Sequence, residues 1–376
     1  MTFTQQEKAY MKQALELAEQ SEGFVEPNPM VGALVVRDGK VVGRGYHKRF
    51  GGPHAEVFAL REAGEAADGA TMYVTLEPCA HHGKTPACAP RVVDAGISRV
   101  VIAAMDPTPE SAGKGVKILQ EGGVQVETGL CREEAVVLNA PFYKFHREGL
   151  PLVTGKWAMS ADGKIATRTH DSRWISCDES RRTVHELRGK VDAIVVGGRT
   201  AREDDPMLTC RDGEKRRTAL RVVLCGSKAP GPSSKLARTA DQAPVLLAYA
   251  RDRPPAGIQE LTERGCEALP LPQADETDHP DPRALLEALA ERGTVNVLVE
   301  GGGHLLGSLF DAGLLDRVMV FMAPLVIGGK KAVNPVAGRG VKLMDEACRL
   351  QRVTMEPSGR DALMKGWVHD PMKWAP

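Results

Sequence analysis

Residues 71–88 read TMYVTLEPCAHHGKTPAC and hold the pattern that decides the fold of the first half of the chain. The apolar, β-branched run at 71–76 predicts a buried strand, and the Gly- and Pro-containing loop after it leads into a short helix expected over 87–95. Outside this stretch helical and strand-like patterns keep alternating, with an opening amphipathic helix and another strand over 99–105. This alternation predicts a three-layer α/β domain.

The first domain has a recognisable beginning and end. Segments 31–36 and 40–47 flank an Arg-Asp-Gly turn and predict a hairpin. A helix expected over 133–146 is followed by Gly149-Leu150-Pro151, where glycine and proline end it. We therefore expect two domains, 1–147 and 148–376, because 376 residues exceed what one core usually serves.

The second half again alternates strands with helices and predicts a second α/β domain. Strands are expected within 192–198, 219–226, 243–250, 295–302 and 317–329, and helices over 178–187, 283–292 and 305–309. The segment 251–283 holds six prolines among many charges. We expect it to be a long surface excursion and not a core element.

Composition narrows the class of protein. Lys plus Arg equals Asp plus Glu at 49 each, which gives no general attraction to nucleic acid. No run of about 18 apolar residues predicts a membrane span, and the charged opening helix is not a secretory signal. Eight scattered cysteines argue against a disulfide framework. We expect a cytoplasmic enzyme or binding protein, without membrane or nucleic-acid partners, that forms a homo-oligomer.

Three residues in the first domain have the types and placement of zinc ligands. His54 begins a helix, Cys79 follows the strand at 71–76, and Cys88 lies eight intervening residues further on. Three N/S ligands and an open position for water are typical of catalytic zinc. Glu56 would lie beside the metal without binding it, where a carboxylate can take a proton from water and return it to leaving ammonia.

A structural zinc site is the alternative interpretation of the same residues. Such a site usually has four protein ligands, and His81 or His82 could supply the fourth. A lone His-x-Glu is most often a solvated helix start. The acidic neighbour Glu56 favours catalysis.

HAE at 54–56 and EPC at 77–79 with a later cysteine resemble the zinc deaminase superfamily. Base and nucleoside deaminases separate their two cysteines by two residues, whereas this chain separates them by eight. That loop, with PNPMVG and GYHKRFGGPHAE before it, resembles the deaminase half of the bifunctional riboflavin-biosynthesis deaminase–reductases. Four later stretches resemble the reductase half of that family: KWAMSADGKIA, SRWIS, RTAREDDPMLTCR and LVEGGGHLLGSLF.

The resemblance implies a fold and a first reaction. A cytidine-deaminase-like three-layer α/β/α domain would precede a dihydrofolate-reductase-like α/β domain. The first would deaminate diaminohydroxyphosphoribosylaminopyrimidine with one Zn²⁺ per chain. Asn28, His47, His81 and Lys84 are implied to hold that substrate, with Lys84 supplying charge for its phosphate. Each could instead be a polar loop residue.

The second domain is implied to reduce the ribosyl group of 5-amino-6-(5-phosphoribosylamino)uracil to ribityl with NADPH. The run Gly301, Gly302, Gly303 after a buried strand could face a phosphate, although it lacks the dinucleotide spacing. By motif match the other cofactor-side residues are Ala158, Trp174, Thr200 and Asp204. The substrate-side residues are Ser172, Arg188, Leu208, Arg211 and Glu300. Lys156 is a candidate proton donor, or a solvated strand lysine.

Three other functions stay open at this point. The chain could be a nucleic-acid base deaminase with an appended binding domain, which the balanced charge and the cysteine spacing disfavour. It could be a non-enzymatic module stabilised by zinc. It could also be a deaminase whose second half is structural only. Ammonia release and NADPH oxidation, measured separately, discriminate among them.

Overall fold

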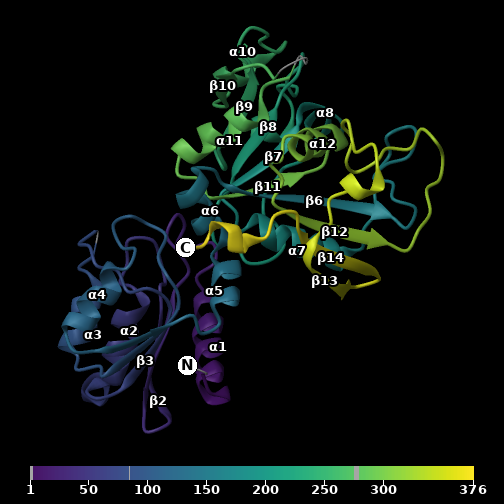
Figure 1. Cartoon of the computed structure of the whole chain (residues 1–376). Coiled ribbons are helices and arrows are strands. Elements are labelled where there is room, and N and C mark those ends of the chain that lie inside the picture. Colours follow the sequence, from purple (N-terminus) through teal and green to yellow (C-terminus); the bar gives the residue numbers. More distant parts are fainter. Residues whose placement is uncertain (1–2, 84, 275–278) are drawn as a thin grey trace. The chain divides into compact units, whose positions relative to one another are not determined.

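The computed structural model describes residues 3–83, 85–274 and 279–376 and groups the chain into two compact units. Unit 1 comprises Met1–Gly149 together with Pro371–Pro376, and unit 2 comprises Leu150–Asp370 (Figure 1). Both units combine a sheet with helices, which confirms the predicted α/β class. In the part of the chain that the structure describes, no helix is long and apolar enough to cross a membrane.

Unit 1 is built on a five-stranded sheet in the order β2-β1-β3-β4-β5. The strands are β1 (Gly32–Arg37), β2 (Lys40–Tyr46), β3 (Thr71–Leu76), β4 (Arg99–Ala104) and β5 (Gln125–Thr128). β1 and β2 form the predicted hairpin, β3 runs antiparallel to β1, and β4 and β5 continue in parallel with β3. The carboxyl ends of β3 and β4 therefore lie at the same edge of the sheet.

Helices cover both faces of this sheet. They are α1 (Gln5–Glu19), α2 (Ala55–Ala63) with a 3-10 turn (Gly64–Ala67), α3 (Cys88–Asp94), α4 (Lys114–Glu121), α5 (Arg132–Leu138) and α6 (Ala140–Glu148). Alternate residues of β3 face opposite ways: Met72 packs in a core cluster with Ala59 of α2, whereas the Tyr73 ring lies 5.3 Å from that of Tyr10 in α1. This arrangement is the predicted three-layer α/β/α architecture.

The helix expected over 133–146 is two helices. It breaks at Asn139, because Pro141 lacks an N–H and can occupy only the first turn of a new helix. A 3-10 turn (Pro371–Trp374) from the far end of the chain packs against both α5 and α6.

Unit 2 is built on a nine-stranded sheet in the order β10-β9-β8-β7-β11-β6-β12-β14-β13. The strands are β6 (Leu152–Ser160), β7 (Ala193–Gly197), β8 (Leu220–Leu224), β9 (Val245–Ala250), β10 (Glu267–Leu271), β11 (Asn296–Glu300), β12 (Arg317–Ala323), β13 (Gln351–Ser358) and β14 (Asp361–Trp367). From β10 to β12 all neighbours are parallel, and β14 and β13 add an antiparallel edge.

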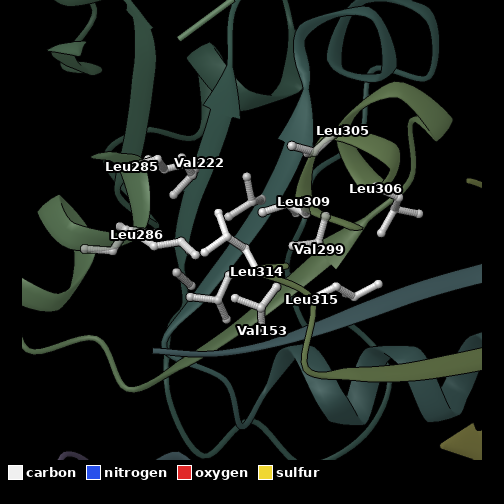
Figure 2. Close-up of a cluster of buried hydrophobic side chains, with 14 of the residues drawn as sticks. Val153, Val222, Leu285, Leu286, Val299, Leu305, Leu306, Leu309, Leu314 and Leu315 are labelled. Carbon is white, nitrogen blue, oxygen red and sulfur yellow. The ribbon is translucent and has the colours of Figure 1, made fainter. Parts of the chain in front are cut away.

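The helices of unit 2 are α7 (Asp178–Arg188), α8 (Gly198–Glu203), α9 (Lys235–Arg238), α10 (Ile258–Glu263), α11 (Pro282–Glu291) and α12 (Gly303–Asp311), with one 3-10 turn at Met344–Glu346. One core cluster joins the central strands to α11 and α12. Figure 2 shows Val222 and Leu285 on one side of it and Val299 and Leu309 on the other. Burial of this apolar face on the sheet holds the parallel strands in place.

Two expectations for unit 2 are wrong. The segment 251–283 is not a surface excursion, because it contributes α10 and strand β10, and Leu271 is buried in the core cluster. Its prolines are compatible with a strand because β10 lies at the edge of the sheet. The strand expected over 317–329 ends at Ala323, just before Pro324. Residues 275–278 lie outside the described part of the chain.

Candidate functional site

His54, Cys79 and Cys88 converge in unit 1, as the sequence predicts. The Nδ1 atom of His54 lies 3.5 Å from the Cys79 sulfur and 3.3 Å from the Cys88 sulfur. His54 is the residue before α2, Cys79 follows β3, and Cys88 is the first residue of α3. The three donor atoms all lie within 4.8 Å of one another, which suits one small cation.

Backbone hydrogen bonds keep the two cysteines together across their eight-residue loop. The N–H groups of Cys88 and Ala89 both donate to the Cys79 carbonyl at 3.1 Å, and the Cys88 N–H also donates to the Cys79 sulfur at 3.3 Å. The hydrogen bond with the Cys88 thiol, helped by His54, lowers the pKa of Cys79 to about 4. The site thus favours a thiolate, the form that binds metal.

The donor set fits zinc with an open position. Two thiolates and one imidazole are zinc ligands. Among the described residues, the cluster gathers no fourth His, Cys or carboxylate; His81 is outside it, with its Nδ1 atom 3.3 Å from the Ser111 hydroxyl. A centre with three protein ligands is the catalytic type, and this geometry disfavours the structural-zinc alternative.

Glu56 is buried beside this cluster, with 3% of its surface exposed. Its Oε2 atom has no hydrogen-bond partner within the described structure, although it is fully enclosed. Burial raises the pKa of Glu56 to about 6. A carboxylate with this pKa can accept and release a proton near neutral pH.

Two predicted substrate-side residues lie together next to the cluster. The Nδ1–H of His47 donates to the Pro53 carbonyl at 3.1 Å, and its Nε2 accepts a hydrogen bond of 3.4 Å from the Asn28 amide. Burial lowers the pKa of His47, so the ring is held neutral. The His47 and His54 rings meet edge to face, with centroids 5.2 Å apart. Lys84 lies outside the described residues.

Sequence reasoning missed two residues that support the loops of this site. Glu77 does not face the metal cluster: its carboxylate accepts hydrogen bonds from the N–H groups of Gly113 and Val116, at 3.1 and 3.2 Å, at the start of α4. Ser111 is fully buried in the loop before α4, where it contacts His81. The position of Glu77, directly before Pro78 and Cys79, gave no local signal that its partners would lie more than 30 residues away.

Unit 2 contains a cavity of about 2010 Å³ at the carboxyl ends of its parallel strands. Ligands of parallel α/β sheets usually bind at this edge. The cavity collects every residue predicted for the second domain: Lys156, Ala158, Ser172, Trp174, Arg188, Thr200, Asp204, Leu208, Arg211, Glu300, Gly301, Gly302 and Gly303. Residues that are more than 140 positions apart in the sequence thus line one space.

A buried carboxylate with two cations forms the floor of this cavity. Glu300 accepts two hydrogen bonds from Arg188, of 2.6 and 2.8 Å, and lies 3.8 Å from the Lys156 ammonium. Burial by itself would raise the pKa of Glu300, but Arg188 holds it at about 2. Burial lowers the pKa of Lys156, although Glu300 opposes that shift. The cluster carries a net positive charge, which suits an anionic ligand.

The glycine run Gly301–Gly303 forms a tight turn at the N-terminus of α12. Gly301 and Gly302 have positive φ angles of 74° and 85°, a backbone conformation that favours glycine. A Cβ atom on Gly303 would lie 2.5 Å from the Asn334 carbonyl oxygen. The turn lines the cavity where α12 begins, and the N-terminus of a helix suits an anionic group such as phosphate.

His185 is a cavity residue that sequence reasoning missed. It lies one turn before Arg188 on α7; its Nδ1–H donates to the Thr209 carbonyl at 3.1 Å, and its Nε2 lies 3.4 Å from the Arg211 guanidinium. Arg188 is engaged by Glu300, so Arg211 is the more exposed guanidinium of the pair. The i, i+3 spacing of His185 and Arg188 was the available signal.

Comparison with known proteins assigns both halves of the chain. Residues 4–104 match the family model of the cytidine and deoxycytidylate deaminase zinc-binding region, and residues 151–364 match the RibD C-terminal domain. The riboflavin biosynthesis protein RibD of Aquifex aeolicus is 39% identical over 358 residues, which cover 95% of this chain and 97% of that protein. RibD of Bacillus amyloliquefaciens is 41% identical over 94% of each chain. The chain belongs to the RibD family.

Solved RibD structures agree with this membership over nearly the whole length. RibD of Acinetobacter baumannii superposes with a TM-score of 0.83 at 33% identity and covers 96% of this chain and 98% of its own. The Thermotoga maritima structure, described as a diaminohydroxyphosphoribosylaminopyrimidine deaminase/5-amino-6-(5-phosphoribosylamino)uracil reductase, gives the same values. As a RibD protein, this chain is a bifunctional deaminase and reductase of riboflavin biosynthesis that acts on small phosphoribosyl pyrimidines with Zn²⁺ and NADPH.

Proposed function

We propose that Glu56 is the proton carrier of the deamination and that His54, Cys79 and Cys88 hold the zinc ion. The observation that carries this assignment is the unpartnered, buried Oε2 of Glu56 beside three converging ligands. Zinc held there supplies Lewis-acid chemistry that makes water reactive at neutral pH. Glu56 accepts a proton from that water and passes one to the departing amino group, so that the ring carbon gains oxygen and loses ammonia.

Asn28, His47, His81 and Lys84 orient the pyrimidine in this proposal. Asn28 and His47 form one hydrogen-bonded pair, which supports a shared role against the heterocycle. Because His47 is neutral, it acts as a hydrogen-bonding group and not as a charge. Lys84 is the group proposed for the substrate phosphate.

For the reductase, we divide the residues that line the cavity into a cofactor side and a substrate side. The glycine turn with Ala158, Trp174, Thr200 and Asp204 receives the nicotinamide cofactor, and Ser172, Arg188, Leu208, Arg211 and Glu300 receive the uracil substrate. NADPH supplies the reducing equivalents. Lys156 supplies the proton, because its ammonium is buried in the cavity and its pKa is lowered. Arg211 binds the substrate phosphate, and Arg188 fixes Glu300.

The two activities belong to separate parts of the chain: deamination to 1–147 and reduction to 148–376, except that the closing segment 371–376 groups with the first unit. The zinc ligands and the cavity residues fall wholly on opposite sides of this boundary, which supports the division. Deamination comes first. A reductase site built to hydrogen-bond the uracil carbonyl would meet an amino group in the diamino substrate, and buried polar groups of the protein would then be left unpaired.

One experiment tests both the sites and their order. Glu56→Gln is mixed with the diamino substrate or with its uracil product, and NADPH absorbance is followed. We expect oxidation with the uracil only. Equal rates with both pyrimidines would refute the order, and no oxidation with either would refute the reductase assignment.

The homo-oligomer is proposed from the edge of the unit 2 sheet. Strand β13 is the last strand in the order, and Val353 and Met355 on it are 47% and 64% exposed. An exposed edge strand can pair with its own copy in a two-fold dimer. Light scattering should show a dimer that Val353→Lys weakens.

Cytoplasmic location is proposed from the free cysteines and the NADPH-dependent chemistry, which suit a reducing compartment.

A further inference from the structure

The last six residues of the chain are part of the deaminase unit. The segment Pro371–Pro376 follows unit 2 in sequence but groups with unit 1. Trp374 is only 1% exposed, and its Nε1–H donates to the Glu148 carboxylate at 2.7 Å. Lys373 and Lys144 place their ammonium groups 4.9 and 5.7 Å from the Trp374 ring centre. The segment is thus fastened to α6 by an enclosed aromatic ring and by polar contacts.

The same helical layer also holds a substrate loop. The Asn139 side chain, at the break between α5 and α6, accepts a hydrogen bond from the Met30 N–H and donates one to the Met30 carbonyl, both of 2.8 Å. Met30 is two residues from Asn28. Asn139 itself is buried, so these two bonds fix the backbone of that loop to the α5–α6 layer.

A second loop is tied to α6 in the same way. The Tyr143 hydroxyl, fully buried, donates to the Met105 carbonyl at 2.9 Å. Met105 directly follows β4 and begins the loop that carries Ser111, the contact of His81. Both loops that support predicted substrate residues are therefore fixed from this helical layer, one by Asn139 at the junction of α5 and α6 and the other by Tyr143 of α6.

We propose that the segment 371–376, acting through Trp374, is a positioning element of the deaminase site. Trp374 covers one side of α6 while Asn139 and Tyr143 hold the two substrate loops from the helical layer. Loss of the indole frees the layer to shift, so the loops lose their fixed places without a change in the zinc ligands. The inference rests on the roles proposed for Asn28 and His81.

The test uses the full-length enzyme with Trp374→Ala and Trp374→Phe, and with Arg147→Met, an exposed position on α6, as the control. For Trp374→Ala we expect the KM for the diamino pyrimidine to rise about tenfold, which corresponds to roughly one lost hydrogen bond. Zinc content and NADPH oxidation with the uracil should match wild type. The KM of Trp374→Phe, which keeps most of the apolar contact, should lie between those of wild type and Trp374→Ala, and Arg147→Met should match wild type.

Hydrogen exchange separates this role from general support of the fold. We expect faster exchange in Trp374→Ala confined to α5, α6 and the loops 26–31 and 105–113. An unchanged KM with unchanged exchange would overturn the proposal, as would loss of zinc with faster exchange throughout unit 1. If Trp374→Ala does not accumulate, the exchange pattern of Trp374→Phe decides in the same way. Absence of ammonia release from the wild type would instead refute the proposed function, and the exchange result would still decide this inference.

Discussion

Lys156 and Glu300 lie opposite each other on neighbouring parallel strands, β6 and β11, and their side chains meet in a salt bridge of 3.8 Å. Arg188 reaches the same carboxylate from α7. The register of two strands thus sets a buried charge cluster on the floor of the reductase cavity. Removing one member leaves an enclosed charge without its partner, which is more costly than losing a surface pair.

Arg188→Met should destabilise unit 2 by about 3–5 kcal/mol, because Glu300 then keeps only the longer contact with Lys156. The measurement is urea unfolding, read from the transition that NADPH shifts to higher urea. Arg182→Met, on the exposed side of the same helix, is the control and should change stability by less than about 0.5 kcal/mol. Equal effects of the two substitutions would contradict the importance of the cluster.

His185 should make unit 2 less stable in mild acid. Burial and the positive charges of Arg188 and Arg211 lower its pKa, so in the window just below about pH 6.5 the unfolded state binds more protons than the folded state. Stability therefore rises with pH across that window. When the pH is lowered from 7.5 to 5.5, the melting temperature of the wild type should fall further than that of His185→Gln. Parallel curves would show that His185 titrates normally.

Glu56→Gln should keep stoichiometric zinc and lose ammonia release about a hundredfold or more, because the ligands remain while the proton carrier is lost. Zinc is measured by atomic absorption and ammonia by a coupled assay. Glu62→Gln, on the exposed side of the same helix, should match wild type. Loss of zinc from Glu56→Gln would make Glu56 a ligand.

Removal of one zinc ligand should separate the two activities. Cys79→Ser should lose zinc and deamination but oxidise NADPH with the uracil at the wild-type rate, since its side chain belongs to unit 1 alone. Cys131→Ser changes a cysteine of the same unit that is outside the cluster and should retain both metal and activity. Zinc retained by Cys79→Ser would reject the ligand set.

Gly303→Ala should weaken NADPH binding, because the added methyl group would meet the Asn334 carbonyl and displace the turn. We expect the Kd to rise about tenfold or more, measured by fluorescence titration. Gly231→Ala, where a Cβ atom meets nothing within 4 Å, is the control. An unchanged Kd would exclude this turn from the cofactor site.

The sequence by itself determined the local elements and the three residues that converge as candidate zinc ligands. The strand at 71–76, the hairpin near the start and the His54, Cys79 and Cys88 set could be predicted because each depends on residue spacing within a short segment. The reductase residues were implied by family resemblance and not by spacing. Strand β10 was missed because its prolines suggested a loop, and a proline-bearing strand is acceptable only at an edge.

Only the tertiary structure decided the contacts between distant segments. Arg188 and Glu300 are 112 residues apart, Trp374 and Glu148 are 226 apart, and Asn139 and Met30 are 109 apart. No periodicity or capping pattern links such pairs, because helix and strand signals extend over a few turns at most. Which polar groups become partners depends on which strands and helices pack side by side, and packing is a property of the whole folded unit.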